Sequence, residues 1–238
     1  MNKEEMKKNI EKLGIKVTKE MLLNLEEYYK ILVEWNKKFN LTRIIEEKEV
    51  NLKHFYDSLT VQKAINLYNY RNLIDVGTGA GFPGIVLAIF FKNLQIDLIE
   101  SNTKKCLFLK EVIKKLSLNN VKVINDRAEK YAKTNREKYD IATCRAVSHL
   151  SIISEISIPM IKVEGYFVPL KSEIKEELTQ SEEKILKMNA KLEKVLEYKL
   201  PIEESKRTIP IIKKISKTNT KYPREYNKIT KDLKNQQK

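Results

Sequence analysis

A cluster of glycines marks the segment of this chain whose composition could do chemistry. Four of the six glycines fall within residues 75–84, which read DVGTGAGFPG. Glycine is needed where a backbone turns sharply or comes close to a ligand, because a Cβ would obstruct both. A purely structural turn would need one or two glycines. The segment therefore predicts a ligand-binding loop, with Asp75, Gly77, Gly79, Gly81 and Phe82 as contacts.

Two cofactor classes are compatible with this loop. Residues 79–84 match the dinucleotide fingerprint G-x-G-x-x-G, so a nicotinamide-dependent oxidoreductase is one alternative. A pyrophosphate needs free N–H groups and no nearby negative charge, whereas Pro83 removes a donor and Asp75 adds a carboxylate. S-adenosylmethionine has no phosphate and carries a positive sulfonium and amino group. The loop therefore favours S-adenosylmethionine.

Acidic residues follow the next two predicted strands. Glu100 ends a β-branched run 23 positions after Gly77, where a carboxylate can accept hydrogen bonds from ribose hydroxyls. Either cofactor would use it. Further along, Ala128 can supply backbone contacts to adenine and Glu129 can accept from its exocyclic amine. A solvated charged turn is an equally valid reading of this last segment.

The methyl acceptor should lie at the end of the fourth strand, around residues 143–147, TCRAV. The chain lacks the Asn/Asp-Pro-Pro-aromatic motif that holds exocyclic amines, which argues against adenine N6 and cytosine N4. Cys144 could attack a pyrimidine, but no second cysteine element supports this, and a core position suits it better.

Guanine N7 has an in-plane lone pair and no proton to remove, so alignment with the methyl group could suffice without a general base. Arg145 would then bind guanine O6 or hold the methionine carboxylate, and it is the predicted catalytic residue; alternatively it pairs with Asp75 or Glu129. His54, Asp57 and Ser58 share one helix face. Three such neighbours cannot readily form a hydrolase triad, so we interpret them as a polar face at the mouth of the sheet.

The surrounding pattern predicts the elements that position these residues. Residues 1–70 show helical spacing and form a predicted N-terminal helical cap. From residue 71, β-branched runs alternate with helical stretches, which predicts an α/β, Rossmann-like, mostly parallel sheet over residues 71–216. The expected strands are 72–76, 95–100, 121–125, 139–144 and 166–170.

The part of the chain beyond Lys171 is charge-dense. Apolar residues at helical spacing predict a surface helix that continues to about Leu196, and residues 196–201 and 208–215 then suggest an antiparallel edge hairpin. Residues 217–238 are predicted to be a basic, partly mobile C-terminal tail.

Composition excludes several function classes. The two cysteines and two histidines match no metal site or redox motif, which predicts no metal and a reducing, cytoplasmic setting. The most apolar stretch, 85–91, is too short to span a membrane, and no leader opens the chain. The net charge of +14 suits a nucleic-acid partner, although 39 of the 46 basic residues are Lys, as a biased coding composition would also produce.

Together these motifs resemble those of the bacterial 16S rRNA guanine-N7 methyltransferases, also called glucose-inhibited division protein B. The resemblance covers most of the chain and rests on these segments: WN at 35–36, NLT at 40–42, H-x-x-DSL at 54–59, the glycine loop, RAE at 127–129, RAV at 145–147 and YPR at 222–224.

The resemblance implies a monomeric, cytoplasmic enzyme. It would methylate N7 of the guanine at nucleotide 527 of 16S rRNA, as free RNA or in the 30S subunit, and release S-adenosylhomocysteine. It also implies cofactor contacts at Gly77, Phe82, Ala128, Glu129 and Arg145, and at Glu100, Ser101 and Asn102. The predicted substrate-binding residues are His54, Asp57, Lys171 and Arg224.

The chain departs from the family pattern twice. Ser172 follows Lys171 where the family usually has Gly, and residues 225–228, EYNK, replace the usual Gly- and Pro-containing end. Both departures bear on substrate docking. Two further alternatives remain, a non-catalytic RNA-binding assembly factor and a small-molecule methyltransferase, and the basic tail disfavours the latter.

Overall fold

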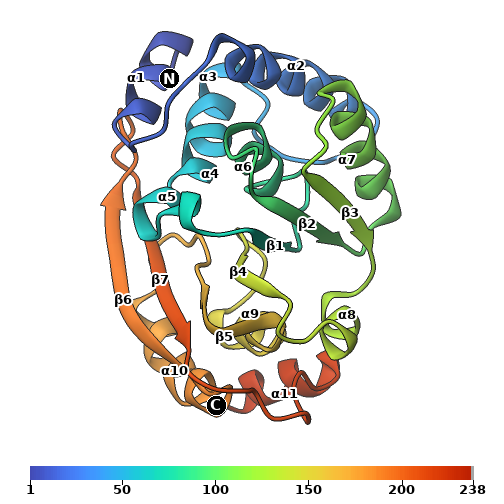
Figure 1. Cartoon of the computed structure of the whole chain (residues 1–238), viewed down its shortest axis with the longest axis vertical. Helices are drawn as coiled ribbons and strands as arrows, with labels where there is room; N and C mark the ends of the chain where they lie inside the picture. The colour runs from blue at the N-terminus through green and yellow to red at the C-terminus, as the bar shows by residue number, and fades with distance from the viewer. Residues whose placement is uncertain (237–238) are drawn as a thin grey trace.

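A seven-stranded sheet organises the chain. The computed structural model describes the backbone of residues 1–236 and the side chains of residues 1–233 (Figure 1). The strand order is β3-β2-β1-β4-β5-β7-β6. Five strands are parallel, β1 Asn72–Val76, β2 Gln95–Glu100, β3 Val121–Asn125, β4 Tyr139–Thr143 and β5 Ile161–Phe167. The hairpin β6 Ala190–Lys199 and β7 Lys206–Lys214 joins antiparallel at the edge, which confirms the predicted fold class.

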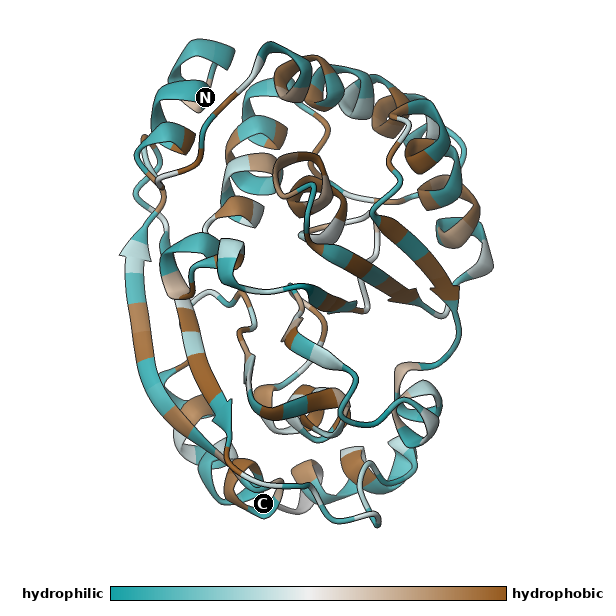
Figure 2. Cartoon of the chain, in the orientation of Figure 1, coloured by the Kyte–Doolittle hydropathy of each residue, from teal (hydrophilic) through white to brown (hydrophobic). Residues whose placement is uncertain are grey.

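Each face of the sheet carries its own hydrophobic core. One core includes side chains of α2 Lys19–Asn36, α6 Gly84–Phe90 and α7 Thr103–Lys115. The other includes side chains of α8 Ala128–Thr134, α9 Leu150–Ser157, α10 Lys175–Lys187 and α11 Tyr226–Gln236. Every residue of α6 is buried, so this helix is apolar all round (Figure 2). The alternation predicted from the sequence thus places helices on both faces.

The N-terminal residues form helices on the face of the sheet that α6 and α7 also cover. After α1 Lys3–Glu11 and α2, the chain runs through α3 Glu47–Glu49, the π-helical η1 Val50–Tyr56, α4 Asp57–Leu59, α5 Val61–Ala64 and the 3-10 helix η2 Leu67–Asn69. π-Helical turns are uncommon and frequently occur at functional sites. Here the turn and the helix after it carry His54 and Asp57, both buried.

The structure corrects the expected bounds of the fifth strand, the surface helix and the edge hairpin. The fifth strand starts at Ile161, not at Tyr166, after the short 3-10 helix η3 Ile158–Met160. The surface helix ends at Lys187, because Asn189 adopts φ +57° and turns the chain into β6 from Ala190. Residues 190–196 are therefore strand where a helix was expected.

The C-terminal segment is also more ordered than a basic tail. It contains α11, whose Ile229 is fully buried in the second core, and Tyr222 is buried beside it. Among residues 1–236, no helix is both long and apolar enough to cross a membrane, and no group of three acidic, His or Cys side chains is placed to hold a metal ion.

Candidate functional site: two clefts at the carboxyl ends of the strands

The glycine loop leaves β1 and returns towards β2. The Gly77 and Thr78 N–H groups both donate to Ile99 O, at 2.9 and 3.2 Å. Gly77, Gly79 and Gly81 have φ of +69°, +62° and +91°, a region that disfavours side chains. The loop conformation thus requires these glycines, as the sequence predicted for a turn at this place.

Packing beneath the loop explains two of its glycines. A Cβ on Gly81 would lie 2.5 Å from the Tyr28 hydroxyl, and one on Gly84 would lie 2.2 Å from Leu98 Cδ2. The Tyr28 hydroxyl donates to the Ala80 carbonyl. Gly79, by contrast, faces open space, since its Cβ would approach nothing closer than 4.0 Å. Only part of the cluster is therefore available to a ligand.

Asp75 supports the loop from below. Its Oδ2 accepts from Thr78 Oγ1 at 2.6 Å and from the Gly84 N–H at 2.8 Å, while Oδ1 has no partner among the described residues. The residue is fully buried, and this burial raises its pKa to about 6. Asp75 thus shapes the loop. Its predicted contact with the cofactor stays a prediction, because it does not line the adjoining cleft.

The cofactor cleft is a cavity of about 530 Å³ beside this loop. It brings together five of the predicted cofactor residues, with Arg127 beside them: Gly77, Glu100, Ser101, Ala128 and Glu129.

Hydrogen bonds fix the acidic residues of the cofactor cleft. Glu100 accepts from the Gly79 N–H at 3.1 Å through Oε2 and from the Asn102 N–H at 2.8 Å through Oε1. Asn102 caps α7 with its side chain and is not a lining residue. Glu129 accepts from Arg127 Nε at 3.1 Å through one oxygen only. Each carboxylate therefore keeps acceptor capacity towards the cleft.

Tyr226 forms an outer wall of the cofactor cleft that sequence reasoning missed. It begins α11, and the Arg127 guanidinium lies 5.0 Å from its ring centroid. Arg224 anchors this segment by donating to Glu155, from Nε at 2.9 Å and from Nη2 at 2.7 Å. Because internal carboxylates occupy the Arg224 guanidinium, its assignment to substrate binding stays a prediction.

The acceptor cleft adjoins the cofactor cleft across Ala146 and Val147. It has a volume of about 990 Å³. Its lining includes three predicted substrate residues, His54, Asp57 and Lys171. The predicted catalytic residue Arg145 also lines it, as do Lys53 and Arg207. The two clefts lie along one edge of the sheet, at the carboxyl ends of its strands, as expected for open α/β folds.

Asp57 is the charge centre of the acceptor cleft. It is 3% exposed and accepts from Arg145 Nη1 at 3.4 Å and from Arg207 Nε at 3.2 Å. Within the described residues Arg145 therefore pairs with Asp57, rather than with Asp75 or Glu129, the two alternatives open from the sequence. Arg207 lies on β7, 150 residues after Asp57, and no local pattern could reveal this contact.

His54 is held as a neutral ring. Arg145 Nη2 lies 2.8 Å from His54 Nδ1, and Thr42 Oγ1 lies 3.0 Å from its Nε2. Burial, helped by the Arg145 charge, lowers the His54 pKa to about 3. Since arginine stays protonated, Nδ1 accepts from Arg145 and Nε2 carries the proton towards Thr42; the Lys53 carbonyl, 3.2 Å from Nδ1, then receives no hydrogen bond from the ring.

Phe82 lies under the acceptor cleft. Its ring stacks on His54 with centroids 4.4 Å apart, and the Arg145 guanidinium lies 5.0 Å from the Phe82 centroid. The structure thus places Phe82 between the loop and the acceptor side, and its predicted cofactor contact stays untested. Ser58 donates to the His54 carbonyl, so His54, Asp57 and Ser58 form no catalytic triad.

Two remaining candidates have structural partners. Lys171 Nζ donates to the Ser148 carbonyl and to Glu177 Oε1, at 2.8 Å for the latter. Cys144 is buried, and burial raises the pKa of its thiol well above the usual value. Because the thiolate is the nucleophilic form, this environment suits a core residue rather than attack on a pyrimidine.

The sheet order, the glycine loop and the acidic residue at the end of β2 define a class I S-adenosylmethionine-dependent methyltransferase. Solved structures share this fold. An O-methyltransferase from Thermotoga maritima has a TM-score of 0.53 at 14% identity, covering 79% of this chain and 72% of that chain. Precorrin-6y C5,15-methyltransferase from Geobacter metallireducens has a TM-score of 0.51 at 18% identity, covering 67% and 87%.

Sequence comparison narrows the class to one family. The family model described as rRNA small subunit methyltransferase G matches residues 21–207. The ribosomal RNA small subunit methyltransferase G of Bacillus subtilis is 43% identical over 94% of this chain and 95% of its own length. That of a Thermoanaerobacter species is 45% identical over 87% of each chain. The chain belongs to the rRNA small subunit methyltransferase G family, an S-adenosylmethionine-dependent family, which confirms the resemblance seen in the sequence.

Proposed function

We propose that this enzyme transfers the methyl group of S-adenosylmethionine to N7 of the guanine at nucleotide 527 of 16S rRNA. It would act as a cytoplasmic monomer on free 16S rRNA or on the 30S subunit. The observation that carries the choice of atom is that the buried titratable side chains of the acceptor cleft, His54 and Asp57, are held by arginine side chains and are not free to take up a proton. A nucleophile that loses no proton fits such a cleft.

The buried polar groups of the acceptor cleft are already paired, and the further carboxylate Glu173 lies at its exposed rim, with a side chain that is 60% exposed. His54 has a pKa of about 3 and its Nδ1 accepts from Arg145. Asp57 is shared by two guanidinium groups, and Lys171 is paired with Glu177. Amine or hydroxyl acceptors need a group that takes up a proton. Guanine N7 attacks with a lone pair and needs only alignment.

Arg145 is the group that would orient the base. Its Nη1 donates to the Lys53 carbonyl and Asp57, and its Nη2 to His54, which leaves the Nε–H and one Nη2–H without partners among the described residues. These donors could bind guanine O6 or, at the border of the two clefts, the methionine carboxylate. The guanine must be unpaired or flipped to enter.

The cofactor cleft has the donors and acceptors that S-adenosylmethionine requires. Glu100 would bind the ribose hydroxyls, the Ala128 backbone and Glu129 would hold the adenine, and Gly77 would allow close approach of the backbone. Bound there, the cofactor supplies an electrophilic methyl group on a sulfonium. The released product would be S-adenosylhomocysteine.

The decisive assay measures methyl transfer from labelled S-adenosylmethionine to unmethylated 30S subunits and to free 16S rRNA. Borohydride and aniline cleavage then maps N7-methylguanine. One cleavage at nucleotide 527, lost in Arg145→Ala, is the expected result. Transfer elsewhere, or none despite S-adenosylhomocysteine binding, would refute this assignment. Thermal stabilisation by NAD but not by S-adenosylhomocysteine would instead support an oxidoreductase, and full cellular function of Arg145→Ala would support a non-catalytic assembly factor.

A further inference from the structure

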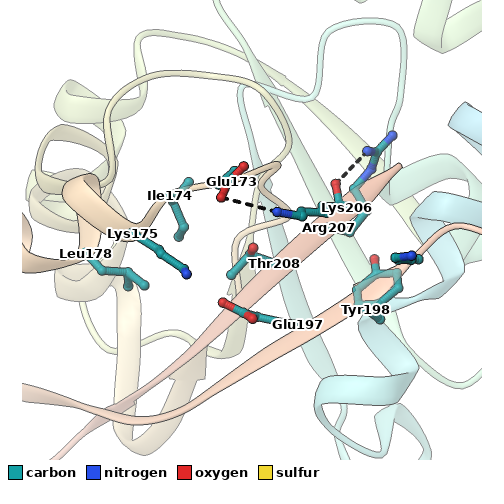
Figure 3. Close-up of a pocket in the computed structure, with 10 residues that line it drawn as sticks. Glu173, Ile174, Lys175, Leu178, Glu197, Tyr198, Lys206, Arg207 and Thr208 are labelled. Carbon is teal, nitrogen blue, oxygen red and sulfur yellow. Dashed lines mark hydrogen bonds and ion pairs between the residues drawn. The ribbon is translucent and has the colours of Figure 1, made fainter. Parts of the chain in front are cut away.

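A third cavity lies beside the acceptor cleft, towards the edge of the sheet. Figure 3 shows the residues that line it. It lies between the loop after β5 and the hairpin β6–β7, and its volume is about 690 Å³. We call it the edge pocket. It shares Glu173, Ile174 and Arg207 with the acceptor cleft, so these residues form a common wall between the two cavities.

Arg207 is held rigidly in this common wall. Its Nε donates to Asp57 at 3.2 Å, and its Nη1 donates to Ser205 Oγ at 3.2 Å and to the Lys206 carbonyl at 2.9 Å. Its Nη2 has no hydrogen-bond partner among the described residues. The Arg207 side chain is 18% exposed. A fixed guanidinium with free donors is well suited to bind a phosphate.

The charge of the edge pocket favours an anion. Lys175, Lys199 and Lys206 join Arg207 around it, against the two carboxylates Glu173 and Glu197. Lys206 reaches Glu173 at 3.5 Å, but both side chains are more than half exposed, so this pair contributes little and can open. Lys175 has no ion-pair partner within the described part of the chain, and it points into the cavity (Figure 3).

The floor of the edge pocket is partly apolar. Ile174 and Leu178 contribute apolar side chains to it, and Tyr198 is a further lining residue. The Tyr198 hydroxyl donates to Thr60 Oγ1 at 2.6 Å, which fixes the ring. A cavity with cations at its rim and apolar side chains on its floor has the chemistry of a nucleotide subsite, where a base or sugar packs and a phosphate is neutralised.

We propose that the edge pocket binds the nucleotide that directly flanks the methylated guanine in the rRNA. A phosphodiester joins neighbouring nucleosides, so two nucleosides in adjoining cavities must place their common phosphate at the shared wall, where Arg207 lies. Asp57 then positions both guanidinium groups, Arg145 at the target base and Arg207 at the phosphate. This inference rests on the proposed rRNA substrate.

The test uses steady-state methylation of unmethylated 30S subunits by the full-length enzyme. The variant Lys175→Ala/Lys199→Ala removes two cations from the edge pocket. The matched control is Lys191→Ala/Lys194→Ala, which removes two exposed cations of β6 that do not line the pocket. We expect the first variant to raise KM for the 30S subunit by about three- to tenfold and to leave kcat unchanged. Its plot of log KM against log salt should be shallower by about 1, because fewer counterions are released.

A structural defect would change other quantities. The S-adenosylhomocysteine affinity of the Lys175→Ala/Lys199→Ala variant should equal that of the wild type, and a benzophenone amino acid placed at Glu197 should crosslink to the nucleotide next to the methylated guanine. Wild-type KM in the variant, an equal effect in the control, or crosslinks remote from the target would overturn the edge-pocket proposal alone. Absence of any rRNA methylation by the wild type would overturn the proposed function, and the edge-pocket proposal with it.

Discussion

Replacing Asp57 by Asn tests the charge centre of the acceptor cleft. The Asp57 side chain is 5% exposed and accepts from Arg145 and Arg207, whose side chains are 15% and 18% exposed. Loss of one partner of a buried pair typically costs 3–5 kcal/mol, and Asn keeps one hydrogen-bond acceptor, so we expect a loss of about 3 kcal/mol in the free energy of unfolding. For a chain of this size, that corresponds to a fall in Tm of roughly 6–12 °C.

Urea unfolding with an unchanged m-value would measure this loss for Asp57→Asn. Glu164→Gln is the control. The Glu164 side chain is 66% exposed and pairs with Lys213, and such surface pairs contribute less than about 1 kcal/mol. A double-mutant cycle with Arg207→Met should recover a coupling of about 1–2 kcal/mol. A stability loss below about 1 kcal/mol for Asp57→Asn, close to that of the control, would refute the role given to this carboxylate.

Three further predictions concern pH, the cofactor and the loop. Folding lowers the His54 pKa from 6.5 to about 3, so between these two pH values the unfolded chain binds more protons and the free energy of unfolding falls as the pH falls. Between pH 7 and pH 5 the expected loss is about 2 kcal/mol, measured by urea unfolding, and the His54→Gln variant should lack it. The same pH dependence of stability in both proteins would contradict the buried neutral ring. Tyr226→Ala should weaken S-adenosylhomocysteine binding by about 5- to 30-fold in calorimetry, whereas Tyr226→Phe, which keeps the ring, should bind as the wild type does. Wild-type affinity in Tyr226→Ala would show that Tyr226 is not part of the cofactor wall. Gly81→Ala should lower the free energy of unfolding by about 2–4 kcal/mol, because the new Cβ would clash with the Tyr28 hydroxyl. Gly14→Ala, whose Cβ would meet no atom within 4 Å, should lower it clearly less, and urea unfolding of the two variants measures the difference.

The parts of the fold that could be predicted from the sequence depend on local patterns. The first three strands match their expected bounds because each is a short apolar, β-branched run between polar segments. The surface helix was extended too far because Ile185, Met188 and Leu192 continue a helical spacing, although Leu192 belongs to β6. A single Asn in the left-handed conformation decides that boundary, and residue type alone does not predict it.

The candidate site could likewise be predicted only where local sequence patterns place its residues. Gly77, Glu100, Ala128 and Glu129 lie at the ends of successive strands, so their meeting in one cleft followed from the order of elements. Arg207 could not be found in this way, because its partner Asp57 is 150 residues away and contact requires the register of the edge hairpin.

The three cavities differ in how far the family match extends over them. The family model covers residues 21–207, which include His54, Asp57, Arg145 and Arg207 at its last position. Tyr226 lies beyond that range. The charge network of the acceptor cleft is therefore built from family-matched residues, whereas the outer wall of the cofactor cleft depends on α11. A change in α11 should consequently alter cofactor affinity and leave the KM for the 30S subunit unchanged.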